Sequence, residues 1–201
     1  MAEPSRATPA AIGLRVKTGR ATAVLLAGSP KAPRVLERRA VDLTDPDVPS
    51  SRQPYHAGLD LPEGESAPVV IEGCEAARHV GLRVVRQLLD DLRRAGHTPS
   101  GIGLVVSSDS EPASLKNPHI RAHALEGMLF RDVLEAAAAA CGVRCLVILE
   151  RQAYERAAPV LGLPVGELKR SITALGAELP KPWGADEKTA TLAAWLAMRT
   201  R

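Results

Sequence analysis

Residues 12–26 read Ile12-Gly13-Leu14-Arg15-Val16-Lys17-Thr18-Gly19-Arg20-Ala21-Thr22-Ala23-Val24-Leu25-Leu26. Apolar and polar residues alternate from Ile12 to Lys17, and a β-branched and aliphatic run follows Gly19. A period of two is typical of a strand with one buried face, and a glycine between two such runs is a turn signal. The stretch therefore predicts a β-hairpin, hinged at residues 18–20, that opens a sheet.

The chain of 201 residues, 45% of them apolar and 24% charged, is long enough to bury one sizeable core. A single domain is the default at this length. The core must be mostly aliphatic, because the sequence has only five aromatic residues: Tyr55, Phe130, Tyr154, Trp183 and Trp195. So few rings argue against a surface that stacks several nucleic-acid bases on aromatic side chains.

The net charge of +3 is too small to indicate a nucleic-acid partner by itself, but the charges are unevenly distributed. Residues 12–40 hold seven basic residues and one acid, a balance of +6, whereas residues 41–66 hold six acids and one arginine, a balance of −5. Neighbouring blocks of opposite sign can neutralise each other in space. Solvated faces are therefore a more economical interpretation than a dedicated basic patch.

The sequence indicates a cytoplasmic protein. Cys74, Cys141 and Cys145 lack paired metal-ligand spacing, so we interpret them as reduced and mostly buried. No apolar run approaches the length of a membrane span, and membrane association is not expected. The richness in Ala, Arg, Gly and Pro is consistent with a bacterial genome of high GC content. Residues 1–11 are expected to form a disordered leader, which leaves residues 12–201 as the single domain.

Beyond the hairpin, the pattern predicts a third strand over residues 34–43 and a Pro-rich, acidic loop over residues 44–68. An amphipathic helix over 72–95, a buried strand over 101–108, a helix over 118–141 and a strand over 143–149 follow. Shorter helices are predicted over 150–158, 166–175 and 185–199. This order predicts an α/β protein with a mixed five-stranded sheet, three antiparallel strands then two parallel, and flanking helices.

Several short motifs resemble the RNase H-like nucleases of the RuvC and YqgF type, in the correct order along the chain. Residues 14–18, Leu-Arg-Val-Lys-Thr, are similar to the Leu-Asp-Val-Gly-Thr pattern that opens that fold. Residues 166–173, Gly-Glu-Leu-Lys-Arg-Ser-Ile-Thr, resemble a Ser-Glu-Val-Lys-Lys-Ala-Val-Thr stretch of RuvC resolvases. Leu149-Glu150-Arg151 and residues 187–190, Glu-Lys-Thr-Ala, resemble the Asp-Glu-Arg and Asp-Lys-x-Ala motifs of YqgF-type nucleases. The resemblance implies an RNase H-like fold.

It also implies a damaged active site. Nucleases of this fold hold two Mg²⁺ ions with carboxylates. Carried over by position, the first aspartate is Arg15, and the glutamate after the fourth strand is Ser107 or Ser108. The last carboxylate is Glu187 or, with a shift of one residue, Asp186, and its partner three residues later is Ala190 or Thr189. We therefore expect a non-catalytic relative without a metal or other cofactor.

Three interpretations of function stay open. The non-catalytic relative retains contact with branched DNA or structured RNA through its basic residues: Arg15, Lys17, Arg20, Arg38 and Arg39. A divergent Mg²⁺-dependent endonuclease would use a relocated set of carboxylates: Asp109, Glu111, Glu150 and Asp186 or Glu187. A protein-interaction scaffold would have abandoned nucleic acid altogether.

One further motif has metal-ligand spacing. His119, His123 and Glu126 fall on one face of the predicted helix over 118–141. No fourth ligand lies nearby in the sequence, which favours a solvated face without metal.

Overall fold

In the computed structural model, which describes residues 8–199 except 60, 63 and 110, five strands form one mixed sheet in the order β3-β2-β1-β4-β5. The strands are β1 (Thr8–Lys17), β2 (Arg20–Ser29), β3 (Ala32–Asp42), β4 (His97–Val106) and β5 (Cys145–Leu149). β1 pairs antiparallel with β2 and parallel with β4, and β5 pairs parallel with β4. The predicted fold class is confirmed.

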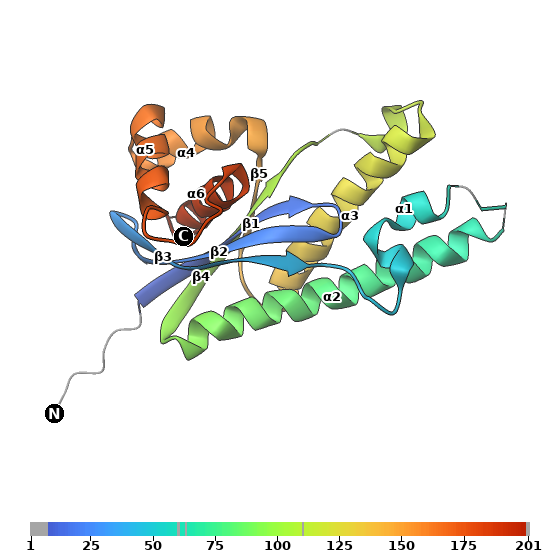
Figure 1. Ribbon diagram of the computed structural model, residues 1–201, viewed down its shortest axis with the longest axis horizontal. Coiled ribbons are helices and arrows are strands. Elements are labelled where there is room, and N and C mark those ends of the chain that lie inside the picture. Colours follow the sequence, from blue (N-terminus) through green and yellow to red (C-terminus); the bar gives the residue numbers. More distant parts are fainter. Residues whose placement is uncertain (1–7, 60, 63, 110, 200–201) are drawn as a thin grey trace.

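Helices cover both faces of this sheet (Figure 1). One face carries the two long helices, α2 (Ser66–Arg94) and α3 (Pro118–Ala140). The other carries α4 (Ala153–Leu161), α5 (Val165–Leu175) and α6 (Ala185–Arg199). No helix within the described residues has both the length and the apolar character that crossing a membrane requires.

The alternating pattern of β1 assigns its side chains to these two layers. Ile12 and Leu14 are fully buried and belong to the core that packs against α2 and α3. Ala11 belongs to the second core, beneath α6, so the odd-numbered positions of β1 face α6. Arg15 is one of these odd-numbered positions, and the strand therefore directs it toward the start of α6.

Two glycines let α6 lie unusually close to the sheet. A Cβ atom added at Gly13 would lie 1.8 Å from the carbonyl oxygen of Ala190, and one at Gly103 would lie 2.3 Å from that of Ala193. Gly13 and Gly103 are partners in the β1–β4 register. The backbone of α6 thus rests on a flat strip of the sheet where any larger residue would push the helix away.

The expected boundaries at the N-terminus need correction. Residues 8–11, placed in the disordered leader by the sequence, are part of β1, where Thr8 pairs with His97 and Ala11 pairs with Leu26. Pairing with two neighbouring strands outweighs the low strand propensity of this Pro- and Ala-containing segment. Residues 1–7 of the expected leader lie outside the described residues.

The expected loop over 44–68 contains more regular structure than its prolines indicate. It holds a 3-10 turn, η1 (Pro49–Arg52), and a short helix, α1 (Pro54–Ala57), which packs against α2 and α3. α2 begins at residue 66, six residues before the predicted start at 72. Pro68 is compatible with that start, because the first turn of a helix has no internal partners for its N–H groups.

Further along the chain, β4 spans 97–106 where 101–108 was predicted, so residues 107 and 108 follow the strand. Two more 3-10 turns are present, η2 (Pro112–Ser114) and η3 (Glu150–Gln152), and the latter precedes α4. The start and end of α6 agree with the prediction to within one residue.

We expect Gly13→Ala to destabilise the protein by about 1–3 kcal/mol or more, because the added methyl group would overlap the backbone of α6. Chemical denaturation measures the change in free energy of unfolding. The matched control is Gly127→Ala in α3, where an added Cβ meets no atom within 4 Å. That change should stabilise the protein by about 0.5–1 kcal/mol through helix propensity. Equal effects of the two substitutions would contradict the close approach of α6.

Candidate functional site

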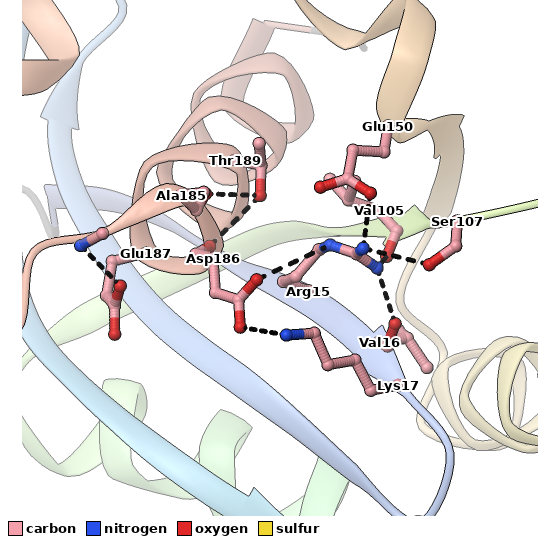
Figure 2. A network of polar contacts seen from close by, with 11 residues as sticks. Arg15, Val16, Lys17, Val105, Ser107, Glu150, Ala185, Asp186, Glu187 and Thr189 are labelled. Carbon is pink, nitrogen blue, oxygen red and sulfur yellow. Dashed lines mark hydrogen bonds and ion pairs between the residues drawn. The ribbon is translucent and has the colours of Figure 1, made fainter.

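The carboxyl ends of β1, β4 and β5 meet the start of α6 at one edge of the sheet. Because these three strands are parallel, the residues that end them lie together. Four polar side chains converge there, as Figure 2 shows: Arg15 from β1, Ser107 after β4, Glu150 after β5 and Asp186 from the first turn of α6.

The guanidinium group of Arg15 occupies the centre of this group. Its Nη2 donates to Glu150 Oε2 at 2.5 Å and to Ser107 Oγ at 3.0 Å. Its Nη1 donates to the carbonyl oxygen of Val16 at 2.8 Å and lies 3.5 Å from that of Val105. The side chain is only 5% exposed. A charge this deeply buried is tolerable only when it is paired and hydrogen-bonded, and Arg15 meets both conditions.

Asp186 completes the network from the side of α6. Its Oδ1 lies 4.0 Å from Nε of Arg15, and its Oδ2 accepts a hydrogen bond of 2.6 Å from Nζ of Lys17. The Nε atom of Arg15 is buried without a hydrogen-bond partner of its own. The network therefore joins two cations, Arg15 and Lys17, to two carboxylates, Glu150 and Asp186, with no excess of negative charge.

Of the two acids that the sequence offered in α6, only Asp186 faces Arg15. Glu187 points away from the network, as Figure 2 shows, and its Oε2 accepts a hydrogen bond of 2.8 Å from the backbone N–H of Gly184. This contact satisfies a backbone donor just before the helix, which is the usual capping role of an acid in a first turn. Thr189 likewise bonds back to Ala185 and Asp186 within the helix.

The remaining candidate acids do not join the network. Asp109 is exposed and forms an ion pair of 3.1 Å with Arg151. Glu111, just before η2, is exposed, and so is Ser108. Glu150 belongs to the site through its contact with Arg15, a placement that the sequence assigned only to the relocated set.

The five basic residues expected to contact nucleic acid are not on one surface. Arg38 donates to the carbonyl oxygens of Pro180 and Lys181, ahead of α6, whereas Arg39 pairs with Asp91 of α2 on the opposite face. The hydrogen bond from Arg39 holds the pKa of Asp91 below its usual value. Arg15 is buried in its own ion pairs. These three arginines are therefore engaged within the fold.

Arg20 and Arg52 line a shallow cavity of about 370 Å³ together with Lys17, which also pairs with Asp186. Thr18, Gln53 and His123 complete its wall. Arg52 was not among the basic residues expected from the sequence to contact nucleic acid, because it lies in the acidic block over residues 41–66. The chain brings it back against the hairpin turn, where its Cγ would lie 3.4 Å from a Cβ added at Gly19.

The helical motif of two histidines and a glutamate, expected to be solvated, is solvated only in part, because His119 and His123 are exposed and Glu126 is not. Glu126 is fully buried, and a histidine from α1, His56, lies against it. His123 lies 3.8 Å from the same carboxylate, whereas His119 only stacks loosely beside His56. No sequence pattern indicated His56, which is 70 residues away from Glu126 along the chain.

Comparison with known proteins gives a consistent account of the fold. No protein-family model matches the chain, and no curated protein matches it. Among solved structures, Thermus thermophilus RuvC is similar over 93% of this chain and 92% of its own, with 13% identity and a TM-score of 0.54. T. thermophilus RuvC in complex with a Holliday junction substrate is similar over 93% of this chain and 90% of its own, with 14% identity and a TM-score of 0.53. The order and directions of the strands agree with this likeness, and the chain has an RNase H-like fold of the RuvC type.

Proposed function

We propose that this chain is a non-catalytic RuvC-like protein that binds branched DNA or structured RNA. The observation that supports the loss of catalysis is the position of Arg15. Its guanidinium group lies between Glu150 and Asp186, in the place where the resemblance expects the first metal-binding aspartate.

The residues at the strand ends do not fit the two Mg²⁺ ions that nucleases of this fold use. Such ions require several anionic oxygen ligands. Here the two carboxylates are already balanced by Arg15 and Lys17, and the serine at position 107 offers a neutral hydroxyl. A divalent cation would also meet the repulsion of a buried guanidinium group within a few ångströms.

A relocated metal site is the weaker candidate. It needs Asp109, Glu111 or Glu187 to converge with Glu150 and Asp186. Asp109 instead pairs with Arg151, and Glu187 caps the start of α6. Among the residues that the structure describes, no three carboxylates bring ligand oxygens together at this edge of the sheet.

The cavity that Lys17, Arg20 and Arg52 line is the surface proposed to contact nucleic acid. Arg20 and Arg52 in this cavity, beside the Lys17–Asp186 pair at the strand ends, present a site for phosphate groups. A protein of the same fold is known in complex with a Holliday junction substrate, which supports a branched duplex as the first ligand to test. This function places the protein in the bacterial cytoplasm, where its three free cysteines would stay reduced.

We expect no cleavage of Holliday junctions, RNA–DNA hybrids or precursor ribosomal RNA by the purified protein with Mg²⁺ or Mn²⁺. The reason is that, within the described part of the chain, no three carboxylates come together to hold the ions. Gel analysis of labelled substrates, with an active RuvC resolvase as the positive control, measures this. Metal-dependent cleavage that is lost in Asp109→Ala or Glu187→Ala would overturn the proposal in favour of the relocated site.

We expect Arg15→Asp to create an affinity for Mg²⁺ that the natural chain lacks. The change replaces the central cation with a carboxylate between Glu150 and Asp186, and three acids around one point bind a divalent ion. In the presence of a chelator the variant should unfold at a lower temperature than the natural chain, because the three carboxylates repel one another. Adding Mg²⁺ should raise its unfolding temperature again in part. Arg15→Met removes the charge without adding a ligand and serves as the control. Equal responses of both variants to Mg²⁺ would contradict this account of the site.

We expect a four-way DNA junction to bind with an affinity that falls with salt at a log–log slope of about −2, from one phosphate contact each by Arg20 and Arg52, because Lys17 is already paired with Asp186. Fluorescence anisotropy at several salt concentrations measures the slope. Arg20→Glu combined with Arg52→Glu should abolish binding. Arg93→Glu, an exposed change on α2, should leave it nearly unchanged. If the natural chain binds no duplex, branched or single-stranded probe even at low salt, the scaffold interpretation replaces nucleic-acid binding.

A further inference from the structure

A second polar cluster lies between α1 and α3, apart from the Arg15 network. His56 of α1 faces Glu126 of α3, and its Nδ1 lies 2.8 Å from Glu126 Oε1. His123, three residues before the glutamate on α3, lies 3.8 Å from Glu126 Oε2 through its own Nδ1. The rings of His56 and His123 have their centroids 4.2 Å apart. Two imidazoles and one carboxylate thus converge on a single point.

The carboxylate of Glu126 points independently to a missing ligand. The side chain is fully buried, and its Oε2 atom has no hydrogen-bond partner. Oε1, in contrast, accepts from the backbone N–H of His56 at 3.2 Å in addition to its contact with the ring. A buried carboxylate oxygen without a partner is costly unless something positively charged completes its surroundings. The side that is incomplete is the one that faces His123.

From this geometry we propose that His56, His123 and Glu126 bind a divalent transition-metal ion, with Zn²⁺ the best match. Among the described residues this is the one group of three His, Cys, Asp or Glu whose ligand atoms lie within 4.8 Å of one another. A tetrahedral Zn²⁺ site with bonds of about 2.0–2.1 Å places its ligands about 3.3 Å apart. The ligand atoms would have to move only slightly to reach this spacing, and His123, whose side chain is 62% exposed, has room for that movement.

The donor set decides the class of ion. Two imidazoles and a carboxylate suit Zn²⁺ and its neighbours in the first transition row, whereas Mg²⁺ and Ca²⁺ prefer oxygen ligands alone. Three protein ligands leave one coordination position for water, and the exposure of His123 gives solvent access to it.

The location of the ion suggests what it would do. α1 belongs to the Pro-rich segment over 44–68 and packs against α3, and the contact of His56 with Glu126 is part of that packing. A bound ion would fasten this segment to the long helix. His123 also lines the cavity of Lys17, Arg20 and Arg52, so the ion would add positive charge at the rim of that cavity. The site does not depend on nucleic-acid binding, and either proposal can fail without the other.

The test is a titration of the chelator-treated full chain with Zn²⁺ by isothermal calorimetry, together with thermal unfolding. We expect one ion per chain with a Kd in the micromolar range or tighter, and a higher unfolding temperature with Zn²⁺. His123→Ala should weaken binding at least tenfold while leaving the metal-free unfolding temperature nearly unchanged, because this side chain is largely exposed. Glu126→Gln should weaken binding similarly, whereas His79→Ala, an exposed histidine on α2, should not.

Cobalt substitution distinguishes this site from the three free cysteines. Co²⁺ bound by nitrogen and oxygen gives weak visible bands without the intense near-ultraviolet absorption of a cobalt–thiolate bond. The proposal is overturned if the natural chain binds no Zn²⁺ at 100-fold excess, if His123→Ala binds with the same Kd and stoichiometry, or if thiolate absorption accounts for all the bound Co²⁺.

Discussion

The buried charge of Arg15 is the constraint on which the strand-end site depends. A guanidinium group that is 5% exposed pays a large desolvation cost, which only close anions and well-placed acceptors can offset. Glu150 supplies the anion, Ser107 and two backbone carbonyls supply acceptors, and Asp186 lies within reach of Nε. Removing Glu150 would leave the buried charge of Arg15 without its closest anion. The guanidinium group and its five partners therefore act as a unit.

This unit connects elements that are far apart in the sequence. Arg15 joins β1 to the segment after β5 through a residue separation of 135, and Lys17 joins the same strand to α6 through a separation of 169. In a nuclease of this fold, metal ions would draw these elements together. Here Arg15, a side chain of the protein itself, links these elements, and they are held together without a ligand.

The sequence was sufficient for the fold because local pattern and tertiary requirement agree in most elements. The period of two in β1 and the apolar run of β4 are strong signals, and α6 has clear limits at residues 185 and 199. The predicted boundaries of elements were wrong where contacts with segments distant in the sequence determine the structure. Residues 8–11 form a strand through pairing with β4, and from Ala10 on with β2 as well, whereas α1 forms within a Pro-rich stretch where it packs against α2 and α3.

The site could be predicted only in part, for a similar reason. The replacement of an aspartate by Arg15 is visible in the sequence, but the identity of its partners is not. Choosing Asp186 over Glu187 requires the direction of each side chain at the start of α6. His56 illustrates the limit best, because nothing in the sequence near residue 56 indicates a partner 70 residues later. Polar contacts between distant segments carry no periodic signal.

The contact of α6 with Gly13 and Gly103 has a consequence for how such a protein can diverge. The backbone of α6 packs directly against the backbone of the sheet at Gly13 and Gly103. This contact does not involve the side chains of the first turn of α6. Substitutions at position 15 or 186 can therefore exchange acid for base while the scaffold holds both positions in place. The backbone contact that positions α6 is thus separate from the side-chain contacts that determine the chemistry of the strand-end site.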